Sequence, residues 1–159
     1  MQLRRRNVRE SAAHCRGSNY GGVSVYARLF LIVGGAVLLL LGIVGYLAIF
    51  NKTSTPWFWL DSGENLAHTF LGIVALAAVY VPGLNTVLRP YYRGIVALVG
   101  VLALFFAAYG FLVAGAAQPN TFGVANLESP ADDILHLVVG VFALAAAWMP
   151  STQPGMAAS

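Results

Sequence analysis

Charged residues are scarce in this chain of 159 residues, where nine Lys or Arg and six Asp or Glu together make up 9%. Ordinary soluble domains carry about 25% charged residues. The hydrophobic share is 58%, and the mean hydropathy is +0.74. Because a small soluble globule needs far more polar surface, this composition excludes a soluble domain, a disordered chain and a nucleic-acid-binding module. The class that remains is an integral membrane protein.

Cysteine and recognisable catalytic motifs are also lacking. Cys15 is the only cysteine, which excludes an intrachain disulfide. The sequence has no Ser-His-Asp order, no phosphate-binding glycine loop and no His-Glu-x-x-His motif. Its long apolar runs contain no Asp, Glu, Lys or Arg that would mark an ion path. We therefore predict that the protein is not an enzyme, and the pattern disfavours a transporter or channel acting alone.

Four long apolar runs are present, and each approaches the ~20 residues that a helix needs to cross the hydrocarbon core. They cover residues 29–50, 66–81, 94–117 and 134–149. Lipid offers no hydrogen bonds to the backbone, so apolar segments of this length must be helical. The predicted fold is therefore an all-α integral membrane protein, with four transmembrane helices in a compact bundle.

The chain divides into a basic arm at residues 1–25, a transmembrane domain at residues 26–150 and a short tail at residues 151–159. Eight of the nine basic residues precede the first run or lie in the second loop, whereas five of the six acidic residues lie in or beside the first and third loops. The positive-inside rule then places both termini in the cytoplasm. Aromatic residues are expected at the interfaces: Trp57, Phe58 and Trp59 outside, and Tyr91, Tyr92 and Trp148 inside.

An internal repeat relates the two halves of the transmembrane domain. With a shift of 68, seven of 19 positions are identical between residues 64–82 and 132–150, and a shift of 65 aligns the first and third runs more weakly. This pattern predicts tandem duplication of a two-helix hairpin, with one repeat at residues 26–82, the other at 91–150, and a pseudo-two-fold axis along the membrane normal. Small residues are expected to pack the helices closely: Gly35, Gly72, Gly100 and Gly140.

An acidic residue stands two positions before the second run and before the fourth, and each is followed four positions later by a histidine, His68 or His136. Their first turns look like capping boxes, in which a cap residue precedes a carboxylate by three positions. The expected structural caps are Asp61, Glu64, Ser129 and Asp132. In this interpretation each histidine bonds a carboxylate of its own turn or a loop carbonyl, and no cofactor is bound.

The alternative interpretation makes His68 and His136 cofactor ligands. Equal depth on either side of the axis would let two imidazoles hold a haem, or let each hold a chlorophyll-type tetrapyrrole, with Gly72 and Gly140 leaving room for the ring. A zinc site from these histidines and the nearby acids is a weaker alternative, and we predict no metal site.

The repeated run from Glu64 through His68 to Gly72, and from Asp132 through His136 to Gly140, resembles an uncharacterised bacterial family of small four-helix membrane proteins, domain of unknown function 4383. The resemblance implies a multi-pass protein of the bacterial plasma membrane and no particular chemistry. We predict a structural or accessory subunit whose partners are membrane lipid and other membrane protein subunits, with no nucleic acid. The alternative is a cofactor-binding or electron-transfer protein that uses the two histidines.

Overall fold

The computed structural model describes residues 24–47 and 59–150, and the regular elements in this part of the chain are helices. Four of them are long and apolar enough to cross a membrane, the third together with a short helix that precedes it. They are α2 (Val25–Val44), α3 (Ser62–Tyr80), α5 (Tyr92–Val113) and α6 (Ala131–Trp148). The predicted all-α class and the four candidate spans are thus confirmed. Cys15, Lys52, Trp57, Phe58, the tail and most of the arm lie outside the described residues.

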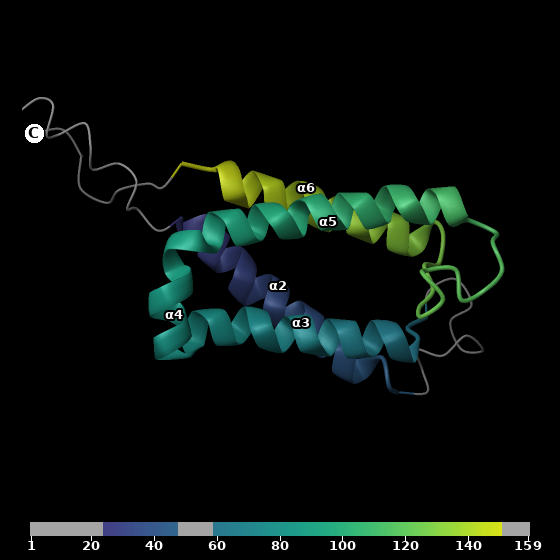
Figure 1. Ribbon diagram of the computed structural model, residues 1–159, viewed down its shortest axis with the longest axis horizontal. Helices are drawn as coiled ribbons and strands as arrows, with labels where there is room; N and C mark the ends of the chain where they lie inside the picture. The colour runs from purple at the N-terminus through teal and green to yellow at the C-terminus, as the bar shows by residue number, and fades with distance from the viewer. Residues whose placement is uncertain (1–23, 48–58, 151–159) are drawn as a thin grey trace, which may run out of the picture.

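The predicted second loop is largely helical instead. It forms α4 (Pro82–Leu88) and the 3-10 turn η2 (Arg89–Tyr91). Pro82 stands in the first turn of α4, where its missing N–H costs no helical hydrogen bond and its fixed φ suits a helix. Proline here begins a new helix as well as ending α3. In Figure 1, α4 crosses from the end of α3 to the start of α5.

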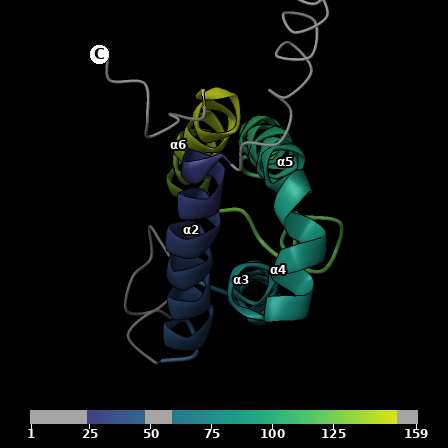
Figure 2. The same ribbon diagram turned by 90° about the vertical axis from the view of Figure 1, so that its left-hand side faces the viewer.

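The four long helices form two hairpins, one of α2 with α3 and the other of α5 with α6 (Figure 1). The first hairpin contacts the second mainly through α2, which packs on both α5 and α6 (Figure 2). By contrast, α3 makes only marginal contact with either helix of the second hairpin. The structure is therefore less compact than the predicted bundle, because α4 spaces the end of α3 from the start of α5.

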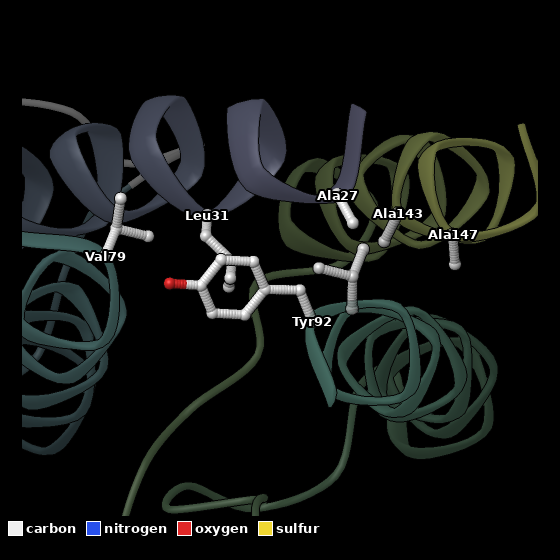
Figure 3. Close-up of a cluster of buried hydrophobic side chains, with 7 residues drawn as sticks. Ala27, Leu31, Val79, Tyr92, Ala143 and Ala147 are labelled. Carbon is white, nitrogen blue, oxygen red and sulfur yellow. The ribbon is translucent and has the colours of Figure 1, made fainter. Parts of the chain in front are cut away.

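A small apolar core joins the hairpins near the start of α2 (Figure 3). It consists of Ala27, Leu31, Val79, Tyr92, Val96, Ala143 and Ala147. The Tyr92 side chain is 1% exposed, and its hydroxyl donates to the Ala78 carbonyl at 2.7 Å and accepts from Asn85 Nδ2 at 3.0 Å. The predicted role of Tyr92 as an interface anchor is wrong, because its hydroxyl is satisfied inside the protein, whereas Tyr91 and Trp148 are exposed.

Glycines set the close approach of helices within each hairpin. A Cβ on Gly72 would lie 2.5 Å from the backbone nitrogen of Leu39 and 2.8 Å from the carbonyl oxygen of Gly35. In the second hairpin, a Cβ on Gly140 would lie 2.8 Å from the Leu104 side chain, and one on Gly100 would lie 3.1 Å from the Gly140 carbonyl oxygen. These four buried glycines have the packing role that the sequence predicts.

Candidate functional site at the acidic end

Acidic and basic side chains lie at opposite ends of the described molecule. The acidic side chains lie where α3 and α6 begin: Asp61, Glu64, Glu128, Asp132 and Asp133. At the opposite end, Arg28 and Arg89 line a small cleft, and Arg93 donates to the Met149 carbonyl at 2.7 Å. In Figure 1 the acidic end is on the right and the basic end on the left.

The start of α3 carries the capping box that the sequence predicts. Asp61 Oδ1 accepts from the backbone nitrogen of Glu64 at 2.9 Å, and Glu64 Oε2 accepts from the backbone nitrogen of Asp61 at 3.2 Å. The second carboxylate oxygen of Asp61 accepts from both the backbone nitrogen and Nδ2 of Asn126, at 2.7 and 2.9 Å. Asp61 therefore ties the loop between α5 and α6 to the start of α3.

The start of α6 differs from the prediction. The residue at the N-cap is Pro130, which makes no side-chain capping bond, and the predicted cap by Ser129 is wrong. Because the helix begins at Ala131, Ser129 stands one residue too early to cap it. Instead, Asp132 Oδ2 accepts from the backbone nitrogen of Glu128 at 2.9 Å, and the backbone nitrogen of Asp132 donates to the Glu128 carbonyl at 2.9 Å.

Internal contacts of the α5–α6 loop hold Asn126 and Glu128 in position. The Asn120 side chain accepts from the backbone nitrogen of Leu127 at 2.8 Å and donates to its carbonyl at 3.1 Å. Phe122 and Gly123 have φ values of 49° and 76°, the positive values that the centre of a type I′ turn requires. Phe122 also stacks on Tyr109 of α5, with ring centroids 5.1 Å apart.

Three carboxyl groups converge beside this loop. Glu64, Glu128 and Asp132 each offer an oxygen, and these oxygens lie within 4.8 Å of one another. Glu128 is 8% exposed and Asp132 is 3% exposed. The Glu128 carboxyl faces Asp132, but neither of its oxygens has a hydrogen bond of normal geometry. Burial, reinforced by the carboxyls of Asp132, Glu64 and Asp61, raises the pKa of Glu128 to about 9.

The two histidines lie close to this acidic cluster but are not part of it. His136 Nδ1 is 2.8 Å from the Asp132 carbonyl, which can only accept, so Nδ1 is the donor in this contact. The Nδ1 atom of His68 is buried without a partner among the described residues. His136 bonds Asp132, one of its expected partners, but through the backbone carbonyl in the first turn of α6 rather than through the carboxylate or a loop carbonyl. Shared cofactor ligation by both rings stays a prediction.

Each hairpin also has one buried polar side chain between its two helices. Asn65 is 2% exposed, and a Cβ on Gly45 would overlap its Oδ1. Asp133 is fully buried, and a Cβ on Gly110 would overlap its Oδ1. Neither Asn65 Oδ1 nor the two carboxyl oxygens of Asp133 has a hydrogen-bond partner in the described structure.

Sequence reasoning missed Glu128 and Asn126 as site residues, because both precede α6 in an irregular loop. The available signal was the acidic residue four positions before Asp132, the same spacing that separates His136 from Asp132. No family model, curated protein or solved structure matches this chain.

Proposed function

We propose that this chain is a small non-enzymatic protein of the bacterial plasma membrane that acts as a structural or accessory subunit of a larger membrane assembly. The observation that carries the proposal is the open face of α3. This helix packs on α2 and α4 but only marginally on α5 or α6. Its outward side chains include Leu66, Phe70 and Ile73, which are 65%, 62% and 52% exposed. A span with one long neighbour leaves room for a partner helix that packs in the membrane.

Tandem duplication of a two-helix hairpin is part of this proposal, and three sets of contacts support it. Each set occurs at aligned positions in the two hairpins. The contact of Gly35 with Gly72 corresponds to that of Gly100 with Gly140. The contact of Leu39 with Gly72 corresponds to that of Leu104 with Gly140. The contact of Gly45 with Asn65 corresponds to that of Gly110 with Asp133. Such pairs favour membership of the four-helix family that the sequence resembles. The packing of the hairpins departs from strict two-fold symmetry, because α2 contacts α6 whereas α3 hardly contacts α5.

The test is co-purification of the full chain in mild detergent, with a matched pair of variants. Ile73 in α3 and Val141 in α6 occupy aligned positions and are 52% and 55% exposed. We expect a membrane protein at a fixed molar ratio to the wild-type chain. It should be lost in Ile73→Trp and retained in Val141→Trp, because in the described structure α3 packs closely on one long helix, whereas α6 packs on two. A wild-type chain that elutes alone from native membranes would contradict the subunit proposal.

A second candidate function is cofactor binding at His68 and His136. The observation that favours it is the orientation of His136, whose Nδ1–H is held by a carbonyl, in the way that outer groups hold metal-ligating histidines. Protein expressed with added haem should then show a visible absorption band that both His68→Gln and His136→Gln remove. A colourless protein whose stability tolerates Gln better than Leu at these positions favours the structural role instead.

A further inference from the structure

We propose that Glu64, Glu128 and Asp132 bind one Ca²⁺ ion between the start of α3 and the start of α6. Their three carboxylate oxygens lie within 4.8 Å of one another. Ligands on opposite sides of Ca²⁺, at bonds of about 2.3–2.6 Å, are separated by about that distance. The convergence therefore fits a single ion with little rearrangement of the side chains.

The state of Glu128 is the independent observation that points to a ligand. Its side chain is 8% exposed, aimed at the other two carboxyls, and without a hydrogen bond of normal geometry at either oxygen. Buried carboxylates are normally paired, hydrogen-bonded or bound to a metal. The backbone already positions the other two groups, since the backbone nitrogen of Asp61 donates to Glu64 and that of Glu128 donates to Asp132.

The donor set favours a hard cation over zinc. All three converging groups are carboxylates, while His68 and His136 are not among them. Ca²⁺ prefers oxygen ligands and tolerates irregular geometry, whereas Mg²⁺ demands a near-octahedral shell and zinc favours nitrogen or sulfur. Asn126 adds a buried amide oxygen without a partner among the described residues, and its Nδ2 is bound to Asp61 beside this cluster.

The ion would connect the two hairpins where their helices hardly touch. Glu64 belongs to α3 of the first hairpin. Asp132 belongs to α6 of the second hairpin, and Glu128 lies in the loop before α6. The apolar core that joins the hairpins lies at the opposite end. Bound Ca²⁺ would therefore act as a clamp at the acidic end, a role that does not depend on any partner subunit.

The experiment measures thermal unfolding and calorimetric binding of the full chain in detergent, first with a chelator and then with about 1 mM Ca²⁺, Mg²⁺ or Zn²⁺. We expect Ca²⁺ to bind at one ion per chain and to raise the unfolding midpoint by several degrees. Glu128→Gln should weaken Ca²⁺ binding about tenfold or more, because it removes one ligand charge. In chelator this variant should be at least as stable as wild type, since Gln has the shape of Glu and places no charge beside Glu64 and Asp132, so lost binding cannot be ascribed to misfolding.

Asp133→Asn is the matched control. It removes one buried carboxylate next in sequence to Asp132, but this side chain lies against Gly110 rather than in the cluster. Ca²⁺ binding should be unchanged in this variant. The proposal is overturned if wild type shows no Ca²⁺ binding, if Zn²⁺ binds in place of Ca²⁺, or if Glu128→Gln binds Ca²⁺ as tightly as wild type.

Discussion

At the scale of single residues, the contrast between Asn65 and Asp133 is the most informative. Both occupy aligned positions, are buried, and place Oδ1 against a glycine of the neighbouring helix. A buried carboxylate without a partner is costly, whereas the amide of the same shape carries no charge. We expect Asp133→Asn to raise the free energy of unfolding and Asn65→Asp to lower it, by about 1–3 kcal/mol each, as measured by thermal unfolding in detergent. Equal destabilisation by both changes would show that the Asp133 carboxylate has a role that its amide cannot fill.

The raised pKa of Glu128 predicts that the free energy of unfolding depends on pH when the protein is in chelator. The ordinary pKa of this carboxyl is 4.5, and burial beside Asp132, Glu64 and Asp61 raises it to about 9 in the folded state. Between these values the folded chain holds a proton that the unfolded chain has released, so the free energy of unfolding falls as pH rises. The slope is at most about 1.4 kcal/mol per pH unit for this one group.

Unfolding midpoints measured between about pH 6 and 8.5 in chelator should therefore decline with pH in wild type, within the window set by the two pKa values. Glu128→Gln should show a flatter profile, because this side chain no longer exchanges a proton. A wild-type stability that increases across this range would contradict the raised pKa of Glu128.

At the scale of helices, close packing within each hairpin rests on positions without a side chain. A Cβ on Gly72 would meet backbone atoms of Gly35 and Leu39, which cannot move aside independently. A Cβ on Gly94, in the first turn of α5, would meet no neighbouring atom within 4 Å. Gly72→Ala should therefore destabilise the protein by about 1–3 kcal/mol through overpacking. Gly94→Ala should be neutral or stabilise it by up to about 1 kcal/mol, because alanine favours helix.

Thermal unfolding in detergent compares these two variants directly. Gly140→Ala should fall between them, because a Cβ there would lie 2.8 Å from the Leu104 side chain, which can partly adjust, and 3.0 Å from the Leu104 backbone nitrogen. A Gly72→Ala protein as stable as Gly94→Ala would mean that α2 and α3 do not pack as closely as described.

At the scale of the whole molecule, opposite charges at the two ends predict the orientation in the membrane. The positive-inside rule places the end with Arg28, Arg89 and Arg93 in the cytoplasm. In a background of Cys15→Ser, an impermeant thiol reagent should label Ala116→Cys on intact cells and Thr86→Cys only after lysis. The reverse pattern would place the acidic end inside. The exposure of both positions in the structure makes them suitable for labelling.

The four spans, the capping box at Asp61 and the packing glycines of the hairpins could all be predicted from the sequence. These features are local or periodic: hydropathy over about 20 residues sets a span, a cap depends on residues three apart, and a glycine in helical register marks a close approach. The internal repeat also aligns Gly45 with Gly110, and Asn65 with Asp133, and the structure places these residues in equivalent contacts.

The acidic cluster and the relation of the hairpins, by contrast, depend on how separate segments pack. Glu128 meets Glu64 only because the loop before α6 folds back and Asn126 binds Asp61, a contact between residues far apart in the chain. The burial of Tyr92 also depends on distant segments, because its neighbours in the apolar core include Ala27 of α2 and Ala143 of α6. No local pattern encodes such contacts, because burial and proximity arise only when distant parts of the chain come together.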